Sequence, residues 1–139
     1  MKIKNIKNIL VYIFIYIFIV GCESNPFSPE ITFLDVYLSS ETDENGYYHI
    51  NYIGSLYHSV QYQTTPNQRV FWGSPNTFNV DWMGQTFVDP IINYSTYADE
   101  WGNGQQMFYL NEEMVGDTLV ICGYVNEYVW ENIFVIVEE

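Results

Sequence analysis

A regular alternation of apolar and polar residues begins near Ile31 and limits the fold of this chain more than any other feature. The apolar members of the clearest runs are Leu34, Val36 and Leu38, then Tyr48, Ile50 and Tyr52, then Phe78, Val80 and Trp82. Side chains with a period of two line one face of a β-strand. The pattern therefore predicts half-buried strands with Trp82 in the core, and no segment from Ile31 onward has a convincing helical period.

Two segments near the C-terminus, Thr118–Val125 and Val129–Val137, are apolar on both faces. Strands covered on both sides have this composition, so we expect both segments in the middle of a sheet. Shorter runs predict further strands near residues 57–64, 68–72, 85–94 and 106–110. Turn residues separate the runs, and Asn45-Gly46 predicts a hairpin because both residue types tolerate positive φ. About seven to nine short strands at this spacing indicate a β-sandwich.

The closing strands resemble those of a known family. The chain reads Gly116-Asp-Thr-Leu-Val-Ile-Cys-Gly-Tyr-Val-Asn126 and then has the apolar run Ile133-Phe-Val-Ile-Val137. This is similar to bacterial immunoglobulin-like domains, which often read Gly-Asp-x-Leu-x-Ile-x-Gly-x-Val before a last strand. The resemblance implies an all-β protein, with a single antiparallel immunoglobulin-like β-sandwich of about 7–9 strands over residues 31–139. It also implies a binding or spacer module without fixed catalytic residues.

The N-terminus has a different composition. Three lysines, Lys2, Lys4 and Lys7, precede twelve uncharged, mostly apolar residues from Ile9 to Val20. A membrane-spanning helix needs about 20 apolar residues, so this block is short for one. It fits the apolar region of a secretory signal, which has about 7–15 residues after a positively charged start.

The next residues, Ile19-Val20-Gly21-Cys22, resemble the lipobox of bacterial lipoproteins. The resemblance implies cleavage before Cys22, a diacylglyceryl group on its thiol and a fatty acyl group such as palmitate on the new N-terminus. Two or more acyl chains anchor a protein stably to a membrane. We expect a signal peptide at 1–21, a lipidated tether at 22–30 and a domain in the bacterial cell envelope, facing the periplasm or the exterior. An ordinary cleaved signal and an uncleaved anchor remain alternatives, and the choice of inner or outer membrane stays open.

Removal of residues 1–21 would leave Arg69 as the one basic residue against 17 acidic residues, a net charge of −16. A chain with this charge has no basic surface to neutralise phosphates, so we expect no nucleic-acid partner. Cys122 would have no intramolecular disulfide partner once Cys22 carries lipid, and we expect it to act as a small buried apolar side chain. His49 is expected to face solvent and His58 to be packed and hydrogen-bonded. We expect no cofactor.

Two acidic loops are candidate ligand sites. Glu41, Asp43 and Asn45 resemble the start of a calcium-binding loop, but its twelfth position is Tyr52, where a bidentate Glu is required. The 99–104 loop places the large ring of Trp101 beside acidic and amide side chains. The possible ligand-binding set in that loop is Asp99, Glu100, Trp101 and Asn103. The simpler interpretation of the first loop is a hairpin tip. The simpler interpretation of the second is that the aromatic ring packs over its own loop.

Three functions remain open. The first is a lipid-anchored, non-catalytic module that binds or spaces an unknown protein or glycan. The second is a carbohydrate- or calcium-binding surface module that uses the 99–104 loop. The third is a small hydrolase with two facing carboxylates, which 17 acidic residues neither support nor exclude.

Overall fold

The computed structural model describes residues 32–54 and 56–139, which belong to one compact unit, Ile31–Glu139. The expected signal peptide and lipidated tether, including Cys22, lie outside the described residues. The strands of the described part are β1 (Leu34–Tyr37), β2 (Tyr48–Asn51), β3 (Tyr57–Thr64), β4 (Arg69–Gly73), β5 (Thr77–Trp82), β6 (Gln85–Pro90), β7 (Ser95–Tyr97), β8 (Asn103–Tyr109), β9 (Thr118–Tyr124) and β10 (Trp130–Glu138), with a 3₁₀ turn at Glu112–Met114. Within these ranges no helix is long and apolar enough to cross a lipid bilayer.

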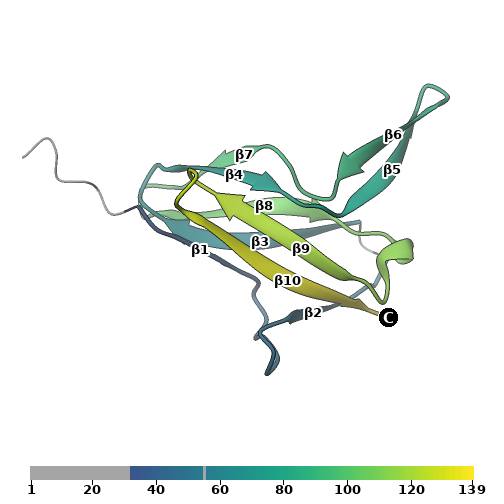
Figure 1. The fold of residues 1–139 in the computed structure, drawn as a ribbon, viewed down its shortest axis with the longest axis horizontal. Helices are drawn as coiled ribbons and strands as arrows, with labels where there is room; N and C mark the ends of the chain where they lie inside the picture. Colours follow the sequence, from purple (N-terminus) through teal and green to yellow (C-terminus); the bar gives the residue numbers. More distant parts are fainter. Residues whose placement is uncertain (1–31, 55) are drawn as a thin grey trace, which may run out of the picture. The chain divides into compact units, whose positions relative to one another are not determined.

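The strands form a β-sandwich (Figure 1). One sheet has the order β1-β3-β8, and the facing sheet has the order β2-β10-β9-β4-β7. In immunoglobulin-like sandwiches, the second and fifth strands pair in one sheet and the third, sixth and seventh pair in the other. Here β3 pairs with β8, as the second strand pairs with the fifth in that arrangement. In the other sheet β4, β9 and β10 are neighbours, as the third, sixth and seventh strands are. The prediction of an all-β sandwich is therefore confirmed, and the strand order is compatible with the immunoglobulin-like arrangement.

Three details differ from the sequence-based expectation. The described residues contain ten strands, not seven to nine, because β5 and β6 form an extra hairpin and β1 and β2 are separate. The pairing of β2 with β10 is parallel, so the sandwich is not wholly antiparallel. The turn at Asn45-Gly46 exists, with Gly46 at φ +82°, but it does not make a hairpin. It leads the chain from one sheet to the other, since β1 pairs with β3 and β2 pairs with β10.

The core lies between the two sheets and uses the inward face of each strand. Tyr62 of β3 and Trp72 of β4 meet across it with ring centroids 5.4 Å apart. The other fully enclosed side chains include Val60, Phe108, Leu119, Ile121, Val135 and Val137. The placement of Thr118–Val125 and Val129–Val137 in the middle of a sheet is confirmed, because β9 is the central strand and β10 lies next to it. Burial of these apolar faces is the main force that holds the sheets together.

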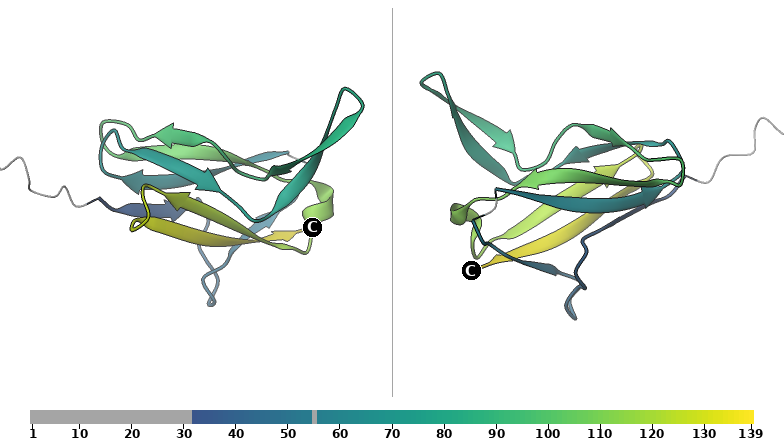
Figure 2. Two further views of the ribbon diagram at one scale, coloured as in Figure 1. Left: turned by 45° about the horizontal axis from the view of Figure 1, so that its top comes forward. Right: turned by 180° about the vertical axis from the view of Figure 1, so that it is seen from behind.

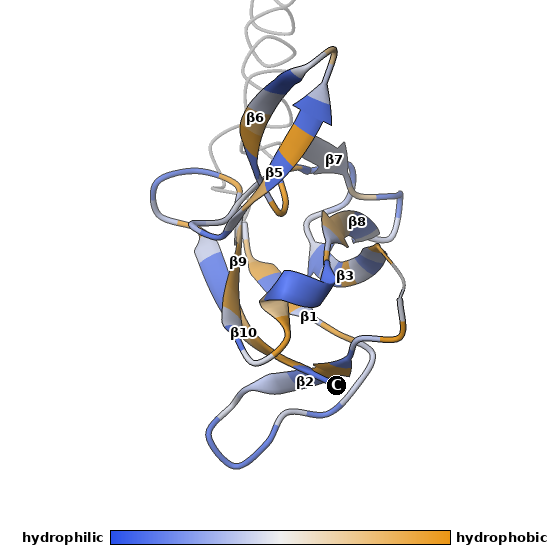
Figure 3. Ribbon diagram, turned by 90° about the vertical axis from the view of Figure 1, so that its right-hand side faces the viewer, coloured by the Kyte–Doolittle hydropathy of each residue, from blue (hydrophilic) through white to orange (hydrophobic). Residues whose placement is uncertain are grey.

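The β5–β6 hairpin projects from the sandwich as a two-stranded sheet of its own (Figures 1 and 2). Its strands meet at a two-residue turn, Met83-Gly84, where both residues have positive φ. Figure 3 shows apolar and polar residues alternating along β5, as the sequence indicates. The predicted burial of Trp82 is nevertheless wrong, since its side chain is 63% exposed. The alternation is real, but no second sheet formed by the described residues covers this part of the hairpin.

Candidate functional site

The 99–104 loop is a tight turn that Asp99 organises. Asp99 Oδ1 accepts hydrogen bonds from the backbone N–H groups of Trp101 at 2.9 Å and Asn103 at 2.8 Å. The Asp99 carbonyl accepts from Gly102 N–H at 3.1 Å, and Gly102 has φ +85°. A side chain in place of Gly102 would overlap the carbonyl oxygen of Thr64. The loop conformation therefore depends on both the aspartate and the glycine.

The candidate ligand residues of this loop do not all point to one site. Asp99 and Asn103 line a shallow depression of about 320 Å³ with Tyr37 and with the amide side chains of Gln61 and Gln105. Trp101 is 70% exposed and Glu100 is also exposed, and neither lines the depression. One carboxylate oxygen of Asp99 is already occupied by backbone N–H groups, so this aspartate has a structural use.

The candidate calcium set lies on a turn of the same design. Asp43 Oδ1 accepts hydrogen bonds from the backbone N–H groups of Asn45 and Tyr47, both at 2.9 Å. Asp43 Oδ2 lies 3.0 Å from Nε2 of His49. Both oxygens of this carboxylate are therefore engaged within the chain. Among residues 32–54 and 56–139, no group of three His, Cys, Asp or Glu side chains is arranged to hold a metal ion.

His49 connects this turn to the last strand. Its Nδ1 lies 2.7 Å from Oε1 of Glu138, while Nε2 contacts Asp43. Hydrogen bonds to Asp43 and then to Glu138 raise the pKa of His49, and the same contact with His49 is the largest cause that lowers the pKa of Asp43. The ring is thus held between two carboxylates. The alternation predicts that His49 faces solvent. Instead, both ring nitrogens contact carboxylates.

Partial burial also alters the pKa values of His58 and Cys122. Burial lowers the pKa of His58, which packs against Phe108 at a ring-centroid distance of 5.9 Å. Its Nε2 has no hydrogen-bond partner in the part of the chain that the structure describes, so the expected packing is present without the expected bond at that atom. Burial also raises the pKa of Cys122, a free thiol on the outer side of β9. A raised thiol pKa favours the unreactive, protonated form.

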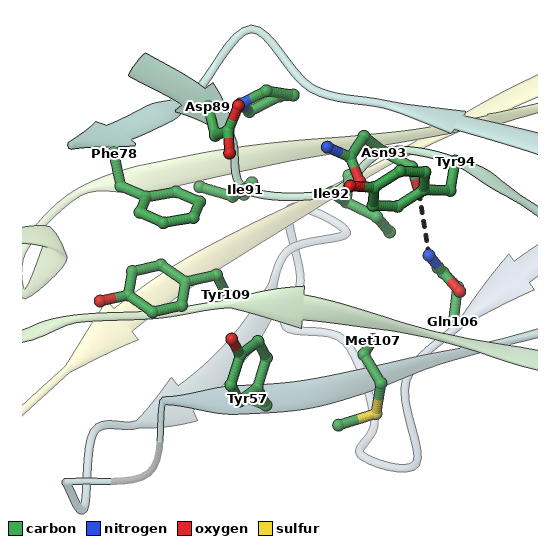
Figure 4. Close-up of a pocket in the computed structure, with 11 residues that line it drawn as sticks. Tyr57, Phe78, Asp89, Ile91, Ile92, Asn93, Tyr94, Gln106, Met107 and Tyr109 are labelled. Atoms are coloured by element: carbon green, nitrogen blue, oxygen red, sulfur yellow. Dashed lines mark hydrogen bonds between the residues drawn. The ribbon is translucent and has the colours of Figure 1, made fainter. Parts of the chain in front are cut away.

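An aromatic groove with a volume of about 280 Å³ lies at the base of the β5–β6 hairpin (Figure 4). It lies where the hairpin, the segment after β6 and strands β3 and β8 come together. Its lining residues are Tyr57, Phe78, Asp89, Pro90, Ile91, Ile92, Asn93, Tyr94, Gln106, Met107 and Tyr109. Small-molecule sites typically have about 300–1,000 Å³, so the groove suits one side chain or one small chemical group.

Aromatic contacts build the groove. Phe78 of β5 stacks on Tyr109 of β8 with ring centroids 3.9 Å apart. Tyr57, which pairs with Tyr109 in the sheet, meets the Tyr109 ring edge-on at 5.7 Å. The backbone N–H of Tyr109 donates to the carbonyl of Ile91 at 2.7 Å, so the segment after the hairpin is bound to the edge of β8. These contacts come from four separate parts of the chain.

Polar groups lie on the rim of the groove. Asp89 and Asn93 lie above the aromatic rings in Figure 4, and Gln106 Nε2 donates to the Asn93 carbonyl at 2.9 Å. Tyr94 has φ +71°, a conformation that costs about 1–3 kcal/mol for a residue other than glycine. Its ring is largely exposed. Backbone strain that holds an exposed aromatic ring beside a groove is a typical feature of binding sites.

Sequence reasoning did not find this groove. It assigned Phe78 to a strand face but had no reason to associate it with Tyr57 or Tyr109, which are distant in sequence. The local signal that could have indicated the groove is Ile91-Ile92 followed by Asn93-Tyr94, since an exposed aromatic residue in a polar turn often has a binding role.

A second aromatic surface covers the outer face of the five-stranded sheet. Phe71 of β4 stacks on Tyr124 of β9 at 5.4 Å, and Trp130 pairs with Tyr124 from β10. The Arg69 guanidinium lies 4.7 Å from the Phe71 ring centroid and 5.7 Å from that of Tyr97. Arg69 is therefore held over aromatic faces by cation–π contacts.

The chain matches no known protein-family model and no curated protein sequence.

Proposed function

We propose that this chain is a lipid-anchored bacterial envelope protein whose β-sandwich binds a protein or glycan partner without catalysing a reaction. The anchor would be the lipid on Cys22, carried over from the lipobox resemblance of Ile19-Val20-Gly21-Cys22. The partner would lie in the periplasm or outside the cell, because the positively charged start of a signal stays in the cytoplasm.

The observation that carries the binding role is the groove of Figure 4. Its exposed residues include Tyr57, Tyr94 and Met107. Aromatic residues and methionine are enriched where proteins bind partners, whereas a solvent-exposed position gives no folding benefit to so many apolar side chains. The rim supplies a carboxylate and amide groups that can fix the orientation of a ligand.

A carbohydrate- or calcium-binding role for the 99–104 loop is the second proposal. The exposure of Trp101 favours it, because an uncovered indole ring is available to stack on a ligand. The internal hydrogen bonds of Asp99 count against direct coordination by its Oδ1 atom. The third proposal, a hydrolase with two facing carboxylates, has no specific observation in its favour.

The binding role can be tested by immobilising the full-length protein and passing a detergent extract of the bacterial envelope over it. Met107→Lys places a charge in the groove at an exposed position that has no role in the core. Tyr128→Lys makes a comparable change in the β9–β10 turn, where the side chain is 84% exposed. We expect a retained partner to be lost with Met107→Lys and kept with Tyr128→Lys. Equal retention by both variants, or no retained partner, would overturn the proposal.

A further inference from the structure

The apolar surface of the groove continues along one face of the β5–β6 hairpin. In the hairpin register Phe78 is opposite Asp89, Val80 is opposite Phe87, and Trp82 is opposite Gln85. Alternate pairs of an antiparallel ribbon lie on the same face. These six residues therefore form one stripe that runs from the groove to the hairpin tip, with four apolar members and two polar ones, Asp89 and Gln85. The stripe is too long for a small ligand alone and suits a polypeptide that extends beyond the groove.

The charge of the domain restricts what can bind there. Residues 32–139 contain 15 acidic residues, and Arg69 is their only lysine or arginine. Arg69 lies over Phe71 and Tyr97 on the other sheet. His49 is paired with Asp43 and Glu138. No cation of the described residues therefore neutralises Asp89, whose side chain is exposed on the rim of the groove.

We infer that the groove takes a lysine or arginine side chain of a basic polypeptide partner. The cation would lie beside the Asp89 carboxylate and over the exposed aromatic rings of Tyr57 or Tyr94, while flanking apolar side chains of the partner pack on the hairpin stripe. Cations are attracted to aromatic faces, and the attraction is larger where water is excluded. The inference rests on the proposed binding role and names the chemistry of the partner.

Other ligand classes fit the groove less well. An anionic ligand would meet Asp89 and a domain of the same sign, with no basic side chain in the groove to bind it. A neutral sugar could stack on the rings, but it would gain nothing from the charge of the domain. A basic partner would instead be attracted over a distance, which raises its association rate at low salt.

Methionine methyl groups provide the readout. Met107 lines the groove, Met83 lies at the hairpin tip with 91% exposure, and Met114 is buried in the core. The full-length protein in non-ionic detergent, labelled at its methionine methyls, would be titrated by NMR with acetyl-Gly-Phe-Arg-Phe-Gly-amide. We expect shifts at Met107 and Met83 and none at Met114. The same peptide with neutral citrulline in place of arginine should bind about tenfold more weakly or not at all.

Two charge variants separate a local contact from general attraction. Asp89→Asn removes the carboxylate from the groove, and Glu127→Gln removes an exposed charge from the β9–β10 turn. We expect about a tenfold loss of arginine-peptide affinity for Asp89→Asn and less than about a twofold loss for Glu127→Gln. Equal losses for the two variants, or equal binding of the arginine and citrulline peptides, would overturn the inference.

A neutral oligosaccharide serves as the third probe. If it shifts Met107 while the arginine peptide does not, the groove is a binding site for another class of ligand, and only the inference fails. If neither probe shifts Met107 at millimolar concentration, both the inference and the assignment of binding to this groove are contradicted.

Discussion

Phe78 stacks on Tyr109 with ring centroids 3.9 Å apart and an angle of 22° between the ring planes. Phe78 belongs to the projecting hairpin and Tyr109 to the edge strand of the three-stranded sheet. The hairpin forms its own sheet, and backbone hydrogen bonds of Ile91 with Asn76 and Tyr109 hold its base. The stack adds a contact between side chains at this base, so it contributes to the angle at which the hairpin leaves the sandwich and to the shape of the groove.

Loss of the stack should loosen the hairpin. We expect Phe78→Ala to lower the free energy of unfolding by about 1–3 kcal/mol, since an aromatic pair adds to the burial of the ring itself. Backbone amides of residues 77–90 should exchange with deuterium faster in this variant. Phe87→Ala is the matched control, because Phe87 is on the same hairpin and is exposed. Equal exchange rates in the two variants would show that the stack does not hold the hairpin.

Gly102 and Gly116 differ in a way that separates backbone strain from steric overlap. Both have positive φ, at +85° and +91°, but an added Cβ meets the Thr64 carbonyl oxygen only at Gly102. We expect Gly116→Ala to cost about 1 kcal/mol and Gly102→Ala about 3 kcal/mol or more. Urea unfolding of the two variants measures this difference. Similar costs would mean that the 99–104 loop can shift away from Thr64.

The contacts of His49 should make stability depend on pH. The pKa of His49 is raised above its ordinary value of 6.5, so its contribution is complete below pH 6.5 and is lost as the pH rises through the higher folded value. The pKa of Asp43 is lowered from 3.8, so its contribution is complete above pH 3.8 and is lost as the pH falls through the lower folded value. The melting temperature of the wild type should exceed that of His49→Ala most between these two values. A difference that stays constant up to pH 9 would contradict this account.

Lipidation should depend on Cys22 and not on Cys122. Mass spectrometry of the N-terminal peptide should find a diacylglyceryl group and a fatty acyl group on Cys22, and the wild type should partition into detergent. Cys22→Ser should lose the lipid, whereas Cys122→Ser should keep it, because Cys122 lies within β9. Unchanged detergent partitioning of Cys22→Ser would rule out the lipid anchor.

The alternation of residues predicted the strands well and their surroundings less well. It correctly grouped Val36 and Leu38, which are both buried, on one strand face, and it placed β9 in the middle of a sheet. It failed for Trp82, since a period of two shows which side chains share a face and not whether another layer covers that face. The strand pairing after Asn45-Gly46 failed for a similar reason, because a turn signal does not say which strands pair.

The site was beyond local sequence reasoning. The sequence predicts Asp43 and Asp99 as candidate ligands because they are acidic residues in glycine-containing loops. In both cases one carboxylate oxygen accepts hydrogen bonds from backbone N–H groups of its own turn. Such bonds are short-range and could have been anticipated from the Asp-Glu-X-Gly pattern that both loops share. The groove could not, because Tyr57, Phe78 and Tyr109 meet only after the sheets have formed.

Hydrogen–deuterium exchange of the wild-type protein, with and without the partner retained from the envelope extract, tests the groove as the binding site most directly. The account predicts protection in residues 77–94 and 106–109, which include the hairpin and the groove. Protection in the 99–104 loop or on the outer strands of the five-stranded sheet, with no change at the hairpin, would contradict it.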